Sequence, residues 1–103
     1  MKNRIILLAA LSTIALAVAA PAAADEALAK GKGCTACHDL KKKLVGPPYA
    51  DVSKKYKGVA GAPETMVTSI LKGSTGKYGP IPMPPNKVTD DDAKKLAAWI
   101  LTL

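Results

Sequence analysis

The sequence predicts a small all-α domain. Apolar residues recur at three- and four-residue intervals in several segments, which is the period of an amphipathic helix. No segment shows the strict apolar–polar alternation that is typical of a half-buried strand. The stretches between these segments are rich in Gly and Pro, which interrupt regular structure. We therefore expect a single domain of about four short helices.

Residues 1–24 have the features of a secretory signal peptide. Lys2 and Arg4 precede an apolar run of about 16 residues, and Ala22-Ala23-Ala24 supplies the small residues of a cleavage site. The alternative is an uncleaved membrane anchor, but the run is shorter than the roughly 20 residues of a spanning helix. We predict a cleaved leader, a domain over residues 25–103, a periplasmic location and no stable membrane insertion after cleavage.

Three shorter helices are predicted before the last one. The first covers residues 25–32, with acidic residues at its start and lysines near its end, as the helix dipole favours. The second covers residues 49–58, where aromatic and apolar residues fall at helical spacing. The third begins at Pro63, because proline suits the first helical position, and ends at Gly73.

The last helix has the clearest pattern. Thr89 is the predicted N-cap, and three aspartates follow it in the first turn. The apolar stripe of an amphipathic helix is formed by Ala93, Leu96, Ala97, Ile100 and Leu101. We expect Trp99, beside this stripe, to pack on the first helix, where Gly31 or Gly33 would permit a close approach.

The strongest functional signal is the run Cys34-Thr35-Ala36-Cys37-His38. In an exported protein, Cys-x-x-Cys-His is typical of c-type haem attachment. Two thiols three positions apart on one turn can each add to a vinyl group of the same porphyrin, and the next imidazole can bind the iron. His38 is the only histidine of the chain. We predict one haem c, held covalently by Cys34 and Cys37 and ligated by His38.

Other uses of a cysteine pair fit this chain less well. A thioredoxin-like dithiol site belongs beside a βαβ pattern, which is absent from the sequence. A zinc site needs further Cys or His ligands, and the chain has none. A disulfide across two residues closes a very short loop and contributes little stability. A haem would also supply apolar bulk to a small domain that contains no Phe.

Residues 73–88 form a long connection rich in Gly and Pro, and such a loop in a small domain is usually functional. Met83 lies at its centre, between Pro82 and Pro84. Proline fixes φ near −65°, so the methionine stands on a stiff, extended segment. We predict Met83 as the sixth ligand of the iron. Met66 is the competitor, but it lies on an apolar helical face, which is typical of a core residue.

With these features the predicted mature chain resembles the class I c-type cytochromes, and more narrowly the small bacterial cytochrome c-551/c-552 group, also called cytochrome c8. The matching segments are Gly33–His38, Val45-Gly46-Pro47, the Gly79–Asn86 stretch and Ala98-Trp99-Ile100-Leu101. The resemblance implies an all-α cytochrome c domain wrapped around one covalent haem. It also implies that the carbonyl of Pro47 accepts a hydrogen bond from His38, and that Asn86 supports the Met83 side of the haem.

Two positions depart from the family pattern. Tyr78 stands where relatives often carry a Trp close to a haem propionate. Ala29 stands where the first helix often has an aromatic residue. The second departure predicts a thinner contact between the first and last helices and a less stable fold.

These features predict a soluble periplasmic electron-transfer protein that carries one electron between respiratory redox partners, and not an enzyme. A haem peroxidase or a gas sensor would need an open or weakly held coordination position, whereas this chain offers two good ligands. A membrane-tethered carrier would differ only in the fate of residues 1–24.

The net charge of the full chain is +7. A lysine-rich surface suits redox partners with acidic docking surfaces. The candidate docking lysines are Lys41–Lys43, Lys54, Lys55, Lys72, Lys77 and Lys87. We expect a monomer and no nucleic-acid binding, because the domain has no Arg and no aromatic stacking platform.

Overall fold

The computed structural model describes residues 21–103, and within them it contains four α-helices and one short 3₁₀ helix. In chain order these are α1 (Pro21–Gly31), η1 (Cys34–Ala36), α2 (Tyr49–Tyr56), α3 (Ala62–Lys72) and α4 (Asp90–Ile100). The described residues form no strand, only two isolated bridges, His38–Lys43 and Ser74–Met83. The predicted all-α class is confirmed for this part of the chain.

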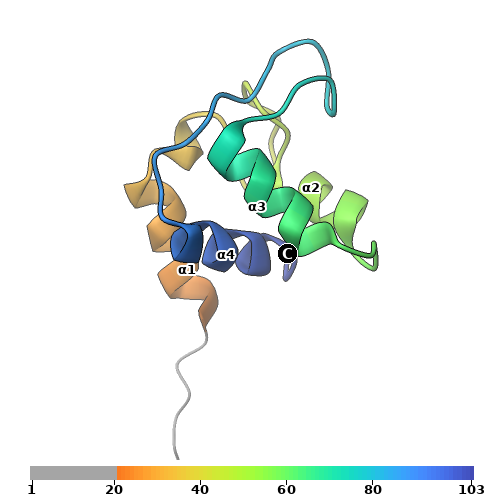
Figure 1. Ribbon diagram of the computed structural model, residues 1–103. Coiled ribbons are helices and arrows are strands. Elements are labelled where there is room, and N and C mark those ends of the chain that lie inside the picture. Colours follow the sequence, from red (N-terminus) through yellow and green to blue (C-terminus); the bar gives the residue numbers. More distant parts are fainter. Residues whose placement is uncertain (1–20) are drawn as a thin grey trace, which may run out of the picture.

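The last helix, α4, organises the domain, because α1, α2 and α3 all pack against it. Figure 1 shows α1 crossing the beginning of α4. The connection after α3 arches away from the helices and then returns to the start of α4 (Figure 1). The loop that contains Met83 therefore forms one edge of the molecule.

The first helix is longer than predicted. It begins at Pro21, inside the predicted leader, and proline is well suited to a first helical position. Glu26 consequently lies within the helix rather than at its start, where its carboxylate is 3.7 Å from the ammonium of Lys30. Residues 1–20, which carry most of the predicted signal peptide, lie outside the described residues, so cleavage stays a prediction. Among the described helices, none is long and apolar enough to cross a membrane.

The contact between α1 and α4 is made by small residues. Ala29, Ala93 and Ala97 are all fully buried in the same apolar core. A methyl group added at Gly31 or Gly33 would meet no atom within 4 Å, so the predicted close approach at these glycines is wrong. Both glycines were candidates because Gly31 ends α1 and Gly33 follows it closely, but the rotation of α1 about its axis brings Ala29 to the core instead.

The other end of α4 packs on α2. The ring of Trp99 meets the ring of Tyr49 edge-on, with centroids 5.2 Å apart. Ser53, which is fully buried, donates its hydroxyl to the backbone oxygen of Leu103 at 2.8 Å. At the start of α4, Thr89 accepts a hydrogen bond from the backbone N–H of Asp92 at 3.1 Å, which confirms the predicted N-cap.

Candidate haem-binding site

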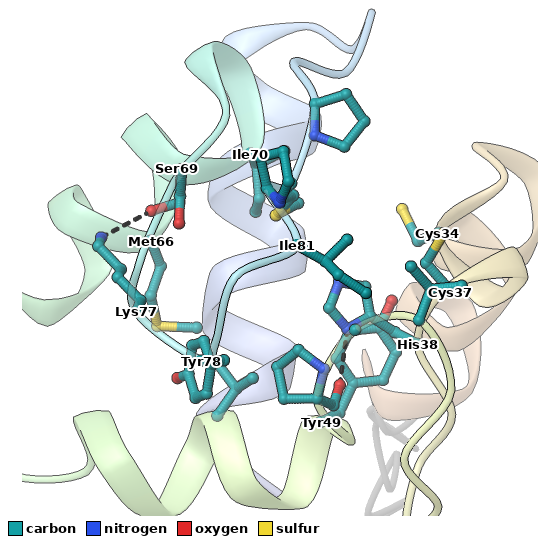
Figure 2. Close-up of a pocket in the computed structure, with 18 of the residues that line it drawn as sticks. Cys34, Cys37, His38, Tyr49, Met66, Ser69, Ile70, Lys77, Tyr78 and Ile81 are labelled. Carbon is teal, nitrogen blue, oxygen red and sulfur yellow. Dashed lines mark hydrogen bonds between the residues drawn. The ribbon is translucent and has the colours of Figure 1, made fainter.

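The six residues singled out from the sequence line one pocket. They are Cys34, Cys37, His38, Pro47, Met83 and Asn86. The remaining lining comes from α2, α3, α4, the loop before α2 and the loop around Met83, and it is mostly apolar. The space between the lining atoms amounts to about 1220 Å³, counting the part open to solvent. Figure 2 shows Cys34, Cys37 and His38 on one side of this pocket and Met66 and Ser69 of α3 on the other.

The cysteine motif forms a tight helical turn at the pocket wall. The backbone N–H groups of Cys37 and His38 both donate to the carbonyl of Cys34, at 3.2 and 3.0 Å. The two cysteines therefore share one turn, as their spacing predicts. Both are free thiols and half-buried. A turn of this kind places two sulfur atoms and the following imidazole on neighbouring positions of the same wall.

Two neighbours fix the imidazole of His38. Its Nδ1 lies 2.7 Å from the backbone oxygen of Pro47. A carbonyl only accepts, so Nδ1 carries the proton and Nε2 keeps a lone pair for a metal. Gly46 lies against the same edge, where a Cβ would come within 2.6 Å of Cε1 and 2.9 Å of Nδ1 of the ring. The hydrogen bond to Pro47 that the resemblance implies is thus present.

A third neighbour of His38 was not singled out from the sequence. The ring of Tyr49 stacks on the imidazole, with centroids 5.1 Å apart and planes 21° from parallel. Tyr49 is only 4% exposed and belongs to the core. Its helical spacing predicts a buried residue, but no local signal in the sequence indicates which side chain it covers.

Met83 is held through its backbone. Its N–H donates to the carbonyl of Ser74 at 2.9 Å, and its carbonyl accepts from the N–H of Ser74 at 3.0 Å. Gly73 comes directly before this bridge, with φ +82° and ψ 176°, a conformation that is essentially restricted to glycine. A Cβ at Gly73 would lie 2.6 Å from the carbonyl oxygen of Met83. The position of Met83 therefore depends on the absence of a side chain at residue 73.

Asn86 ties the Met83 loop to the end of α3. Its side-chain amide donates to the carbonyl of Ile70 at 3.1 Å and to that of Pro84 at 3.3 Å. Its backbone N–H also donates to Ile70, at 3.0 Å. The supporting position that the resemblance implies for Asn86 is consistent with these contacts.

The other methionine also lines the pocket. Met66 is 4% exposed and lies in the core cluster, as its helical position predicts. Because it borders the pocket as well, the structure brings two thioethers to the site. Figure 2 shows Met66 on α3, on the side of the pocket away from Cys34 and Cys37. Its sulfur is supplied by a packed helix, whereas that of Met83 comes from the proline-rich loop.

Tyr78 lies in a cationic corner of the pocket. The ammonium of Lys55 is 4.4 Å from the centroid of the Tyr78 ring and 3.1 Å from the carbonyl of Lys77. The ammonium of Lys77 donates to the hydroxyl of Ser69 at 3.0 Å. This corner is the polar part of a largely apolar lining, and it suits a carboxylate.

Burial governs the ionisation of the site. It raises the pKa of the Cys34 thiol, an effect that the nearby Tyr49 hydroxyl partly offsets. Burial also raises the pKa of Tyr49, to which the neighbouring Cys34 adds. The pKa of Tyr78 is raised to about 12, by burial first and then by Tyr56 and Asp51. Cys34 and both tyrosines therefore stay protonated at neutral pH.

The residues present fit a haem. A porphyrin is a large apolar disc with two carboxylates, and the pocket combines apolar walls with one cationic corner. Two thiols on one turn provide the attachment points, while an imidazole and a thioether provide donors of the kinds that bind haem iron. Among the described residues, no group of three or more His, Cys, Asp or Glu side chains could hold a metal ion by itself.

Comparison with known proteins identifies the family of this chain. The family model described as "Cytochrome c" matches residues 22–103. The chain belongs to the cytochrome c family. It is 58% identical over 80 residues to the cytochrome c-552 of Hydrogenobacter thermophilus, covering 78% of this chain and 82% of that protein. It is 52% identical over 87 residues to the cytochrome c-551 of Pseudomonas aeruginosa, covering 84% of each.

A solved structure agrees with this assignment. Wild-type cytochrome c552 of Nitrosomonas europaea superposes on the chain with a TM-score of 0.74 and 48% sequence identity, covering 76% of this chain and 98% of that one. The protein is therefore a class I c-type cytochrome of the c-551/c-552 group, as the sequence motifs predict. Haem and electron transport follow from membership of this family.

Proposed function

We propose that this cytochrome is a periplasmic one-electron carrier with a single haem c. Cys34 and Cys37 attach the haem, and His38 and Met83 ligate its iron. The observation that carries the proposal is one largely apolar pocket that brings together the two thiols, the imidazole and the thioether. The bound haem would supply reversible one-electron exchange at its iron, and the chain would control access to it.

The residues around the pocket prepare both ligands. His38 donates from Nδ1 to Pro47, which leaves Nε2 for the iron and raises the basicity of the ring. The thioether of Met83 has no proton to lose, so its lone pair is available to the iron without a deprotonation step. Because the backbone of residue 83 is fixed at Ser74, little further order is needed when its sulfur binds.

Two protein ligands favour electron transfer over catalysis. With His38 and Met83 both bound, the iron would offer oxygen or peroxide no ready access, so we propose no enzymatic activity. The rim of the pocket has exposed apolar side chains, with Val45 55% and Ile81 64% exposed, and two lysines, Lys43 and Lys77, among its lining. A small contact surface of this composition suits brief docking of a redox protein that has an acidic surface. We propose that the carrier itself is a monomer.

The optical spectrum of the protein purified from the periplasm tests the ligand set. We expect a low-spin c-type spectrum with the weak far-red band of sulfur-to-ferric charge transfer, unchanged by carbon monoxide in the reduced state. A high-spin spectrum, or ready binding of carbon monoxide, would contradict the carrier and favour a gas sensor. The mass of the same sample tests export, since residues 25–103 plus one haem would exclude a retained leader.

The two methionines that line the pocket provide the sharpest comparison. We expect Met83→Ala to open the iron to carbon monoxide and to abolish the far-red band. Met66→Ala should keep the band and lose stability by about 2–5 kcal/mol, because a buried core side chain is removed. Carbon monoxide binding by Met66→Ala, with Met83→Ala unaffected, would transfer the ligand role to Met66.

A further inference from the structure

Tyr49 contacts the histidine of the Cys-x-x-Cys-His motif. Its ring stacks on the imidazole of His38, with centroids 5.1 Å apart and planes 21° from parallel. We propose that Tyr49 is a positioning residue for electron transfer, whose ring fixes the plane of the His38 imidazole and thereby helps to set the reduction potential. This inference rests on the proposed role of His38 as a haem ligand.

Tyr49 is itself held firmly. Its backbone N–H donates to the carbonyl of Asp39 at 2.9 Å, so its main chain is tied to the residue that follows His38. Its ring meets Trp99 edge-on at 5.2 Å. It is also the first residue of α2 and follows two prolines, whose φ angles are fixed. The tyrosine is thus anchored both to the loop it contacts and to the core of the domain.

The imidazole needs such a support. Rotation about χ2 of histidine has broad minima, so the side chain does not choose its own plane. The hydrogen bond from Nδ1 to Pro47 restrains one edge of the ring at 2.7 Å. One hydrogen bond still permits the ring to tilt about it, and contact with the face of Tyr49 opposes this tilt. The pair of contacts defines the plane, which neither defines alone.

A defined plane has a chemical consequence. A short hydrogen bond from Nδ1 makes the imidazole a stronger electron donor, which favours the ferric state and lowers the reduction potential. If the ring tilts, this hydrogen bond becomes longer and weaker. Loss of the Tyr49 ring should therefore raise the potential. Simple loss of packing predicts the opposite, because water that enters the site would stabilise the more highly charged ferric haem and lower the potential.

Substitution of Tyr49 in the intact, haem-loaded cytochrome tests the inference. Tyr49→Phe keeps the ring and removes the hydroxyl, whereas Tyr49→Leu removes the ring. The control is Val67→Ala, because Val67 packs against the core from α3 but does not line the pocket. The measurements are the reduction potential, the spread of the haem-methyl proton shifts in the ferric state, and the exchange rate of the Nδ1 proton of His38 in the ferrous state.

We expect Tyr49→Leu to raise the potential, change the haem-methyl pattern and speed Nδ1 proton exchange by about tenfold or more, because the hydrogen bond is weaker. Tyr49→Phe should remain close to the wild type in all three. Val67→Ala should lose stability only. If Tyr49→Leu yields no holoprotein, Tyr49→Met makes the same comparison, since it fills much of the volume without a ring.

Two results would overturn the role of Tyr49. One is a Leu or Met variant that loses stability like Val67→Ala but keeps the wild-type potential and haem-methyl pattern. The other is a potential that falls, which would indicate entry of water and a purely structural residue. Failure of the proposed function looks different, because then the wild-type protein itself would lack a covalent haem or a reversible one-electron couple.

Discussion

The two predicted iron ligands are held in opposite ways. The side chain of His38 is fixed directly, by a hydrogen bond at one edge, a glycine against the ring and an aromatic face beside it. Met83 is fixed through its main chain, which pairs with Ser74 across the loop. The imidazole is a rigid, polar ring, so neighbouring groups can contact its edges and faces directly. The thioether side chain is flexible and its sulfur is only a weak hydrogen-bond acceptor, so the protein fixes the position of the Met83 Cα instead.

This difference predicts that substitutions near His38 and substitutions near Met83 have different effects. A change near His38 should alter the electronic properties of a ligand that stays bound, because the cysteine motif keeps it beside the haem. A change in the loop of Met83 should alter how often the ligand leaves. Gly46 lies against the His38 ring and Gly73 lies against the backbone of Met83, so an alanine substitution at each glycine compares the two ligand sides directly.

Gly73→Ala should have the largest effect. Its backbone conformation is nearly inaccessible to alanine, and the new Cβ would lie 2.6 Å from the carbonyl oxygen of Met83. Together these effects should cost on the order of 3 kcal/mol of unfolding free energy and open the iron to carbon monoxide. Denaturant unfolding and titration with carbon monoxide measure both. The control is Gly61→Ala, with a similar φ of +73° but no atom within 4 Å of the new Cβ. A Gly73→Ala protein that excludes carbon monoxide would disprove backbone control of Met83.

Gly46→Ala should come second. The added Cβ would meet the His38 ring at 2.6 Å and force it away from Gly46, at a cost on the order of 1–3 kcal/mol. We expect a shifted reduction potential and an altered haem-methyl pattern while carbon monoxide remains excluded, because the Met83 loop is untouched. Gly31→Ala, where nothing lies near the new Cβ, serves as the reference. Carbon monoxide binding by the Gly46 variant would mean that the two sides are not independent.

Asn86→Ala tests the tie between the loop and α3. It removes the donors to Ile70 and Pro84 but leaves the backbone bond from residue 86 to Ile70. The loss should be about 1–2 kcal/mol, and added imidazole should capture the iron roughly tenfold faster. Stopped-flow mixing measures the capture rate. Thr68→Ala, which removes an exposed hydroxyl bond on α3, should change neither quantity appreciably. Unchanged capture by Asn86→Ala would limit this residue to a role in folding.

The features that could be predicted from the sequence are those set by residues close together in the chain. The turn that joins Cys34 and Cys37 and the cap of α4 depend on neighbours within a few residues, and the structure shows both. The carbonyl of Pro47 was implied only by the family resemblance, because nothing in a lone proline indicates which donor it will face. The motif that contains Met83 was visible as a stiff loop, but its pairing with Ser74 was not.

The contacts that the sequence did not reveal depend on how distant segments meet. Tyr49 follows His38 by eleven positions, and its face reaches the imidazole only because the intervening loop folds back. Gly31 and Gly33 suggested a close helix contact, yet the rotation of α1 brings Ala29 to the core instead. A periodic pattern indicates which residues are buried, but the partner of each buried residue is a property of the whole fold.

Thr89→Ala should have the smallest effect, and it separates two explanations of how Met83 is released from the iron. Thr89 caps α4 directly after the loop, and loss of its bond to Asp92 should cost about 1 kcal/mol. If local ties hold Met83, this variant should lose stability and still capture imidazole at the wild-type rate. If capture rises as it does in Asn86→Ala, release of Met83 follows general unfolding of the domain. The same stopped-flow measurement, made on both variants at equal temperature, decides between local opening and global opening, because only the former depends on which bond is removed.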